Sequence, residues 1–353
     1  MRLTVLQVAY PFAAVGPDAV GGAEQVLSRL DHLLTQMGHN SVVLAAEGSV
    51  AAGRLAATSL PRGPITDALR QQVQAAHRRN LLDVLRHQAI DLVHMHGLDF
   101  ERYLPPPGIP VLVTLHLPPT WYPQGIFRLT RPDTWLHAVS QAQHRECPPC
   151  PTLLAPILNG VPVEELATRV SRRGFAVNLG RICPEKNQHQ ALEAGSLAGL
   201  PVLLGGQVFP YAEHERYWQE AVLPLLANGP HRFLGPVGFA RKRRLLSAAR
   251  CLLSTSLAPE TSSLVAMEAL ACGTPVIAFP SGALPEIVKH GVTGFLVETP
   301  REMALAIREV GRLDREACRA AARRRFSADA MVARYVGLYA RLTRAGGARA
   351  AFA

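Results

Sequence analysis

The sequence predicts an α/β fold of two domains, each containing a parallel β-sheet. Short, continuous apolar runs alternate with segments of helical periodicity along the whole chain, and such runs are typical of strands covered on both faces. The length of 353 residues fits two domains at roughly 150 residues each. The apolar fraction of 48% is enough to fill a buried core in both domains.

The first half of the chain predicts repeated strand–helix units. A strand at about 3–9 leads to a helix from Ala23 to Met37, which Gly38 ends as a left-handed cap. The other expected elements of this half are strands at Ser41–Ala46, Asp91–His94 and Val111–Leu115 and a helix at about Thr66–Gln88. A proline-rich segment at about 146–156 and the turn Asn159-Gly160 mark the domain boundary.

The strand–helix pattern restarts near Phe175. The expected strands are Ala176–Leu179, Val202–Gly205, Arg232–Leu234, Cys251–Ser254 and Pro275–Phe279, and the expected helices are Gln188–Ala198, His214–Leu226, 240–249, 263–271 and a last one, Ala328–Leu342. The domains are therefore expected at 1–158 and 159–327, with residues 328–353 as a C-terminal helix. Because ligands bind beyond the carboxyl ends of parallel strands, two such halves predict a cleft at their junction.

The chain is basic, with 37 basic and 27 acidic residues and a net charge of +10. No nucleic-acid motif and no aromatic-rich basic patch occurs, so nucleic acid is not expected as a partner. The clearest basic clusters are Arg241–Arg244 and Arg319 with Arg323–Arg325. One interpretation is solvated helix faces, and the other is contact with phosphate-bearing ligands or a weak peripheral contact with lipid headgroups.

Neither a signal peptide nor a run of roughly 20 apolar residues is recognisable, so a cytoplasmic protein is expected. Six cysteines are scattered along the chain, which does not indicate a disulfide framework. Cys147 and Cys150 have the spacing of a redox or zinc motif. Their proline-rich surroundings and the lack of a second such pair favour an incidental pair in a loop.

A basic pair follows the first strand of the second half, in Gly180-Arg181-Ile182-Cys183-Pro184-Glu185-Lys186. Arg181 stands directly after the strand, and Lys186 opens the next helix. A planar guanidinium and a compact ammonium group at a helix N-terminus together suit a diphosphate. For this motif alone, a surface turn with two basic residues remains the alternative.

Two glutamates flank the start of the helix at 263–271. Glu260 falls in the preceding loop, and Glu268 falls on a turn otherwise rich in Ala, Leu and Met. A carboxylate in such a setting needs a partner, because burial of an unpaired charge is costly. A ribose diol and a nearby arginine are the two candidates for Glu268. The backbone N–H groups of Ser263 and Leu264 begin the helix and can hold a phosphate.

These motifs together resemble a known family. Glu260 and Glu268 have the E-x7-E spacing of retaining glycosyltransferases of family 4, or glycosyl transferases group 1, and the runs 266–278, 282–288 and 291–297 resemble the donor-domain signature of that family. The motif from Gly180 to Lys186 is similar to its diphosphate-binding motif. The segments 159–161 and 21–24 resemble its interdomain segment and its first glycine-rich loop. The resemblance is specific in the second half of the chain and looser in the first.

The resemblance implies the GT-B fold, in which two Rossmann-like domains face each other across a deep cleft. Domain 1–158 would bind the acceptor, domain 159–327 would bind a nucleotide sugar, and the last helix would cross back to the first domain. The implied catalytic residues are Arg181, Lys186, Glu260 and His116, and the implied donor-binding residues are Gly22, Gly180, Arg181, Lys186, Glu260, Ser263, Leu264 and Glu268.

Each implied residue has a role in that site. Arg181 and Lys186 would stabilise the departing diphosphate, Ser263 and Leu264 would offer amides to it, and Gly22 would let the backbone approach the donor. Glu268 would bind the ribose, Glu260 would contact the donor sugar, and His116 would lie near that sugar. For His116 taken alone, a strand-end histidine held by a backbone hydrogen bond is the alternative.

The implied activity is retaining transfer of a sugar from a UDP- or GDP-sugar to a polysaccharide, a lipid-linked acceptor or a small molecule such as a natural product. No metal ion or other cofactor is expected, because cations and helix-end amides can stabilise the leaving group and no DxD-type motif stands in a plausible loop. A sugar-nucleotide epimerase of the same fold and a non-catalytic nucleotide-sugar-binding protein are the alternatives. A dehydrogenase is disfavoured, since no G-x-G-x-x-G motif follows Gly21-Gly22.

The remaining observations concern the sugar and the acceptor. Thr261–Ser263 is more polar than the family pattern after Glu260, which leaves the identity of the sugar open. His96 is a candidate lining residue of the cleft. Trp121 and Tyr122 form either an acceptor wall that stacks on a sugar or a packed loop, and the packed loop is favoured.

Overall fold

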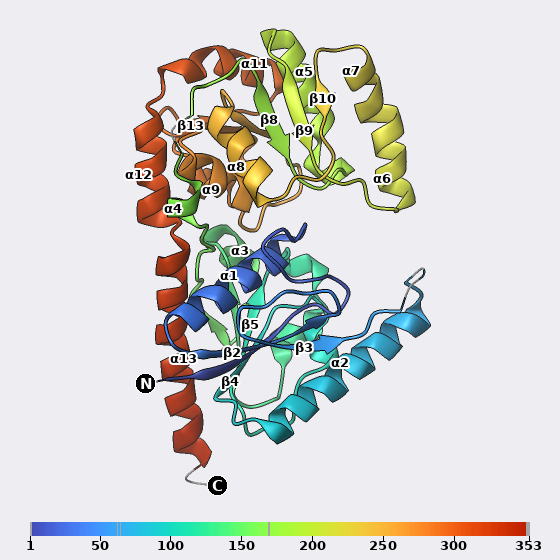
Figure 1. Ribbon diagram of the computed structural model, residues 1–353, viewed down its shortest axis with the longest axis vertical. Helices are drawn as coiled ribbons and strands as arrows, with labels where there is room; N and C mark the ends of the chain where they lie inside the picture. The colour runs from blue at the N-terminus through green and yellow to red at the C-terminus, as the bar shows by residue number, and fades with distance from the viewer. Residues whose placement is uncertain (1, 62, 64, 169, 351–353) are drawn as a thin grey trace. The chain divides into compact units, whose positions relative to one another are not determined.

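The computed structural model describes residues 2–61, 63, 65–168 and 170–350, with the surroundings of side chains described to residue 344. The chain divides into two units, Met1–Leu158 with Asp329–Ala353, and Asn159–Ala328. Each unit is built on a parallel sheet with helices on its faces (Figure 1), so the predicted class of two α/β domains is confirmed. None of the described helices is long and apolar enough to span a bilayer.

The N-terminal unit contains a seven-stranded sheet in the order β3-β2-β1-β4-β5-β6-β7. The strands are β1 Thr4–Val8, β2 Asn40–Ala46, β3 Arg54–Thr58, β4 Leu92–Met95, β5 Val111–Leu115, β6 Thr134–Ala138 and β7 Leu153–Leu154. Strands β4 and β5 are buried at every position, as their continuous apolar sequence predicts. The sequence did not predict β3, because this edge strand is largely exposed and lacks an apolar run.

Among the described residues, four α-helices complete the N-terminal unit: α1 Gly22–Gln36, α2 Asp67–His87, α3 Gln141–Glu146 and α13, which spans Ala328–Ala350. Thr66 caps α2 by accepting a hydrogen bond from the Leu69 amide at 3.2 Å. Helix α13 contributes Tyr335 and Tyr339 to the core of this unit, both fully buried. The Tyr339 hydroxyl lies 2.7 Å from Nδ1 of His94 on β4, so α13 is anchored in the N-terminal core.

The C-terminal unit contains a six-stranded sheet in the order β10-β9-β8-β11-β12-β13. The strands are β8 Ala176–Leu179, β9 Val202–Gly205, β10 Arg232–Phe233, β11 Leu252–Ser254, β12 Val276–Ala278 and β13 Gly294–Leu296. Its α-helices are α4 Val163–Leu166, α5 Gln188–Ala198, α6 Ala212–Tyr217, α7 Leu223–Ala227, α8 Phe239–Ala248, α9 Leu264–Ala271, α10 Leu284–Ile287, α11 Pro300–Glu309 and α12 Arg315–Arg325.

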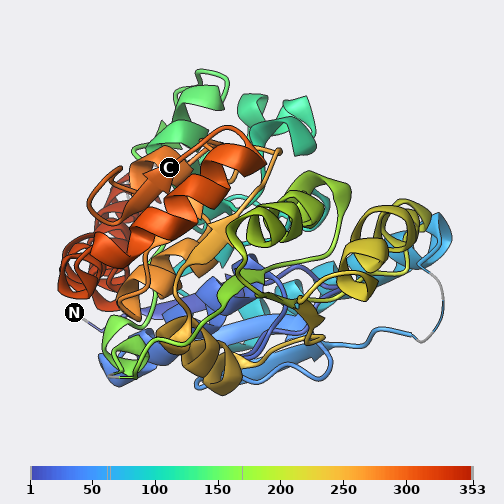
Figure 2. The ribbon, with the colours of Figure 1, turned by 90° about the horizontal axis from the view of Figure 1, so that it is seen from above.

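Helices cover both faces of the second sheet. Helices α4, α8, α9, α10 and α12 supply apolar side chains to one core, and α5 and α11 supply them to the other. Helices α5 and α11 pack side by side (Figures 1 and 2). Between α6 and α7 the chain makes a π-helical turn at Trp218–Val222, just before Pro224, which cannot donate a backbone hydrogen bond within the helix.

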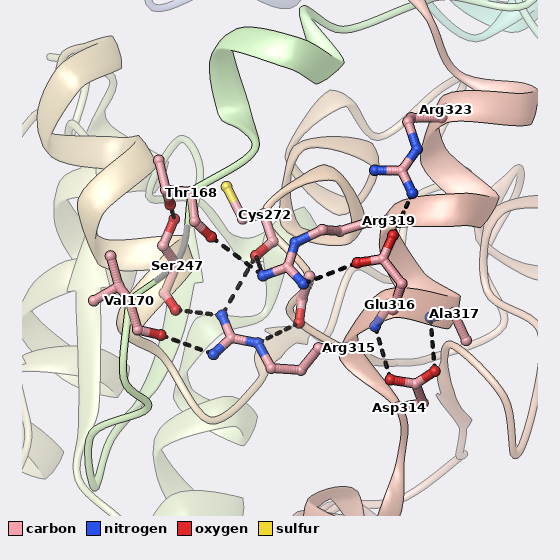
Figure 3. A network of polar contacts seen from close by, with 11 residues as sticks. Thr168, Val170, Ser247, Cys272, Asp314, Arg315, Glu316, Ala317, Arg319 and Arg323 are labelled. Atoms are coloured by element: carbon pink, nitrogen blue, oxygen red, sulfur yellow. Dashed lines mark hydrogen bonds and ion pairs between the residues drawn. The ribbon is translucent and has the colours of Figure 1, made fainter.

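The arginines of α12 donate hydrogen bonds that connect this helix to other segments of the C-terminal unit (Figure 3). Arg319 donates to the carbonyls of Thr168 and Cys272 at 3.2 and 3.4 Å, and Arg315 donates to that of Gly273 at 3.2 Å. These carbonyls include the end of α9, where backbone acceptors lack partners within the helix and negative charge accumulates. Arg323 pairs with Glu316. The interpretation of this cluster as a solvated face is therefore wrong for Arg319, whose side chain is only 14% exposed.

Candidate active site

The basic motif and the first glutamate meet at the carboxyl end of β8. Lys186 ends a short 3-10 turn, η4 Pro184–Lys186, and its Nζ forms an ion pair with Oε1 of Glu260. The loop of Glu260 is fixed by Gly282, whose φ is +55° and where a Cβ would lie 2.3 Å from the Glu260 carbonyl oxygen. The Ala283 amide donates to that same oxygen at 2.7 Å. Only glycine allows this close approach, so Gly282 sets the position of Glu260.

Arg181 follows Gly180, whose amide donates to the Gly205 carbonyl at 3.0 Å. The half-buried Arg181 guanidinium has no hydrogen-bond or ion-pair partner among the described residues. Burial alone would raise the pKa of the nearby Glu185 carboxyl. A hydrogen bond from the Cys183 thiol, the backbone of Glu185 and the charge of Arg181 outweigh burial, so this pKa lies below its usual value. Arg181 thus presents a positive charge near Cys183, Glu185 and His214.

Glu268 lies on α9 and is only 4% exposed. Its Oε1 accepts a hydrogen bond from Nζ of Lys242 on α8 at 2.5 Å, and the Lys242 side chain is itself 11% exposed. The partner of Glu268 in the protein is therefore a lysine rather than an arginine. Lys242 belongs to the Arg241–Arg244 cluster, so a solvated helix face is the wrong interpretation for this member.

Helix α9 begins on a strained residue. Ser263 has φ 43° and ψ 69°, a left-handed conformation that non-glycine residues adopt rarely and usually at functional positions. The turn lets Leu264 begin α9, whose first N–H groups have no partner within the helix. The neighbouring hydroxyl of Ser262 is buried and has no hydrogen-bond partner among the described residues. Buried polar atoms are normally paired, so an orphaned hydroxyl here indicates a place for a ligand or water.

The remaining predicted site residues lie in the N-terminal unit. Gly22 is the exposed first residue of α1. His116 directly follows β5 and is 8% exposed. Its Nε2 lies 2.9 Å from Nδ1 of His96, and the two rings stack with their centroids 5.2 Å apart. His96 in turn contacts Oε1 of Gln7 at 2.9 Å. His116 is thus part of a buried polar chain with His96 and Gln7.

Burial keeps these histidines neutral. Burial, followed by the effect of His137, lowers the pKa of His116 to about 3. Burial and the neighbouring imidazoles of His116 and His137 hold the pKa of His96 well below its usual value. A neutral His116 can donate or accept a hydrogen bond at neutral pH without carrying charge.

The loop after His116 is packed. The Tyr122 hydroxyl accepts hydrogen bonds from the amides of His116 and Leu117 at 2.9 and 3.3 Å, and Tyr122 is 3% exposed. This geometry supports the packed loop over an acceptor wall for Tyr122, whereas Trp121 is 44% exposed. Burial raises the pKa of Cys147 to about 11, so this thiol stays protonated at neutral pH.

Comparison with known proteins accounts for both units. The family model described as Glycosyltransferase Family 4 matches residues 20–148, and the one described as Glycosyl transferases group 1 matches residues 167–325. The chain belongs to the family-4 glycosyltransferases. In this glycosyltransferase, the first match includes Gly22 and His116. The second match includes all the predicted donor-site residues from Gly180 to Glu268.

Sequence relatives match parts of this glycosyltransferase. A D-inositol 3-phosphate glycosyltransferase of Corynebacterium efficiens is 36% identical over 153 residues, which are 39% of this chain and 36% of that protein. The protein of the same description from Streptomyces griseus is 46% identical over 81 residues, 23% of this chain and 17% of that protein. The matched segments therefore span well under half the length of these relatives.

Solved structures match almost the whole fold of the glycosyltransferase. AviGT4, a glycosyltransferase involved in avilamycin A biosynthesis, is 23% identical with a TM-score of 0.73, over 97% of this chain and 98% of its own. Anabaena Alr3699/HepE, solved in complex with UDP and glucose, is 20% identical with a TM-score of 0.73, over 96% of this chain and 100% of its own. At these identities, the likeness shows the GT-B fold.

The sequence does not single out Lys242 and Ser262, which lie beside the predicted donor-site glutamates. Lys242 stands 26 positions before its partner Glu268 and its neighbours are all arginines, so the sequence groups it with the basic cluster Arg241–Arg244. Ser262 is one of three consecutive hydroxyl residues in the polar segment Thr261–Ser263. The signal that distinguishes Ser262 from Thr261 and Ser263 is its orphaned hydroxyl, which appears only in the folded chain.

Proposed function

We propose that this glycosyltransferase transfers a sugar from a UDP-sugar to an acceptor hydroxyl with retention of the anomeric configuration and without a metal ion. The observation that carries the proposal is the pair of contacts Lys186–Glu260 and Lys242–Glu268 on the two sides of the start of α9. In this proposal, these contacts hold two carboxylates near the cation motif and near the start of α9, whose first N–H groups would bind a phosphate. The complex of Anabaena Alr3699/HepE with UDP-glucose supports the choice of uracil nucleotide.

Each group of the donor unit has a task in this proposal. The bond between the sugar and the diphosphate breaks, the acceptor oxygen forms the new bond on the same face, and the acceptor proton passes to the departing diphosphate. Arg181 and Lys186 stabilise the charge that grows on the diphosphate, together with the amides of Ser263 and Leu264. Glu268 accepts hydrogen bonds from the ribose hydroxyls, and Glu260 contacts the donor sugar.

The N-terminal unit supplies a neutral imidazole in this proposal. Because the pKa of His116 is about 3, the ring would offer a hydrogen bond to the transferred sugar rather than a proton or a charge. Gly22, at the start of α1, would allow the backbone to approach the donor. The acceptor is a hydroxyl compound that this unit selects.

A donor screen tests the proposal. Nucleotide sugars that bind the native protein raise its melting temperature by mass action, and the best donor is then incubated with and without candidate acceptors. The expected products are the free nucleotide diphosphate and a glycoside with the anomeric configuration of the donor, measured by NMR. An inverted product would overturn retention. Formation of an epimer of the donor without acceptor would indicate an epimerase, and binding without any turnover would indicate a non-catalytic nucleotide-sugar-binding protein.

A further inference from the structure

A thiol, a carboxylate and an imidazole meet beside the cation motif of the C-terminal unit. Cys183, Glu185 and His214 place their sulfur, carboxylate and ring ligand atoms within 4.8 Å of one another. Cys183 and Glu185 belong to the loop and 3-10 turn after β8, and His214 comes from α6. The sequence does not predict this cluster. His214 stands 29 positions after Glu185, and no other potential metal ligand in its helix stands at the spacing typical of a metal site.

Two side-chain atoms of the cluster lack hydrogen-bond partners, although the Cys183 thiol donates to the Glu185 carboxylate. Glu185 Oε2 and His214 Nδ1 are both buried without a hydrogen bond to any described residue. Cys183 is fully buried, and its sulfur lies 3.6 Å from the Arg181 carbonyl oxygen, which is a weak contact for a thiol. Since buried polar atoms are normally satisfied, two orphaned atoms in a cluster that also holds a thiol indicate a missing common partner.

The scaffold holds all three side chains in place. The Glu185 carbonyl accepts hydrogen bonds from the Leu257 amide at 2.8 Å and the Ser256 hydroxyl at 3.3 Å, which fixes the turn. The His214 ring packs edge-on against Tyr211, with centroids 5.1 Å apart, and is 7% exposed. The ligands are therefore presented by two anchored segments, and small side-chain rotations would close the cluster to the roughly 3.5 Å ligand spacing of a tetrahedral ion.

We propose that Cys183, Glu185 and His214 bind a zinc ion. Sulfur, imidazole nitrogen and carboxylate oxygen are the three donor types that zinc takes in proteins, and a thiolate donor disfavours magnesium or calcium. The positive charge of the nearby Arg181 would repel a zinc ion. The negative charges of a thiolate and a carboxylate offset this repulsion. Three protein ligands leave one coordination position for water or another small ligand. The inference does not rest on the proposed transfer reaction.

Metal titration of the full chain, without an affinity tag and after removal of metals, tests this site. Wild-type protein should bind one zinc ion with a dissociation constant below about 1 µM, measured by competition with a chromophoric chelator. Cobalt in the same site should show a thiolate-to-metal charge-transfer band. Zinc should also raise the melting temperature, because it binds only the folded cluster.

Variants assign the ligands. Cys183→Ser should abolish the cobalt band and weaken zinc binding more than about a hundredfold. Loss of a residue that only supports a ligand, without touching the metal, has a smaller effect. Cys150→Ser, a half-buried cysteine of the other unit, should change neither quantity. Glu185→Gln should weaken zinc binding while the band remains, and it decides the case if Cys183→Ser does not fold. Absence of stoichiometric zinc binding, unchanged affinity in these two ligand variants, or loss of the band in Cys150→Ser would overturn the proposal.

Discussion

Lys242 and Glu268 stand 26 positions apart in the sequence and lie on two helices, yet Nζ and Oε1 are 2.5 Å apart in a setting where neither side chain is more than 11% exposed. This contact gives a nearly buried carboxylate a fixed partner and orients it in a family-4 glycosyltransferase. Lys242 therefore holds in place Glu268, the residue that we propose to bind the ribose.

Loss of Lys242 should therefore affect stability and nucleotide binding together. Lys242→Met leaves Glu268 as an uncompensated buried charge, and we expect a loss of about 3 kcal/mol in the free energy of unfolding. Nucleotide affinity should fall as well, because Glu268 loses its orientation. Urea denaturation and calorimetric titration with UDP measure the two effects. The matched control is Arg244→Met on the exposed side of α8, and equal losses in both variants would contradict a specific role of the pair.

Glu268→Ala should weaken nucleotide binding itself. In the proposed site, this carboxylate accepts two hydrogen bonds from ribose hydroxyls, so removal should lower UDP affinity about tenfold or more. The affinity for inorganic diphosphate should remain unchanged, because Arg181 and Lys186 are intact. An unaltered affinity for UDP would disprove the role in binding ribose.

The cations of the diphosphate site should matter for transfer. Arg181→Ala and Lys186→Ala should each lower kcat/KM about a hundredfold, which is the scale of one contact to charge that develops in the transition state. Arg216→Ala, an exposed arginine on α6, is the control and should leave kcat/KM unchanged. If both site variants kept the wild-type kcat/KM, the assignment of the diphosphate site would be wrong.

Ser262 should influence which donor sugar is used. Its buried hydroxyl has no partner among the described residues, so we expect it to hydrogen-bond to the sugar. Ser262→Ala should change the ratio of kcat/KM between two donors that differ in one hydroxyl by up to about tenfold. Ser281→Ala is a suitable control, because the Ser281 hydroxyl is already bonded to the Ala258 carbonyl at 2.7 Å. An identical ratio in Ser262→Ala and the wild type would remove Ser262 from sugar selection.

The buried histidines should make the protein acid-sensitive. Burial lowers the pKa of His137 to about 4, so this ring is neutral in the folded state where the unfolded chain, near pKa 6.5, takes up a proton. The unfolded state binds more protons in this window, and stability falls as the pH drops from about 6.5 toward 4. Each such histidine should cost about 2 kcal/mol between pH 7.5 and 5.0.

Denaturant midpoints at pH 7.5 and pH 5.0 measure this effect. In His137→Gln the loss of stability between the two pH values should be smaller by about 2 kcal/mol than in the wild type, whatever the absolute stability of the variant. The control His87→Gln removes a histidine whose side chain is 70% exposed and should keep the wild-type pH dependence. The same dependence in all three proteins would show that His137 is not a source of acid sensitivity.

Transfer should persist in EDTA. The proposed site stabilises the diphosphate with Arg181, Lys186 and the start of α9, so a chelator should leave the initial rate within about twofold of the untreated enzyme. The same treatment would remove zinc from the cluster of Cys183, Glu185 and His214, which we do not assign to catalysis. Complete loss of transfer, restored by a divalent ion, would refute the metal-independent mechanism.

Much of the secondary structure of this protein is determined by local sequence. Continuous apolar runs such as Val111–Leu115 are typical of strands buried on both faces, and Thr66 caps the helix that it precedes, so local sequence predicts the alternation of strands and helices. The cation motif and the glutamates could also be predicted, because loops at the carboxyl ends of strands place them near helix starts. The edge strand β3 and the arginine-rich α12 lacked a hydrophobic pattern and were not predicted.

Only the tertiary structure determines which polar groups interact with one another. The pairing of Lys242 with Glu268, the contact of His96 with His116, and the binding of the α9 carbonyls by Arg315 and Arg319 all join segments distant in sequence. Charge and hydrogen-bonding capacity are properties of single residues and are visible in the sequence. Which acceptor lies within 3 Å of which donor depends on how sheets and helices pack, and no local pattern records that arrangement.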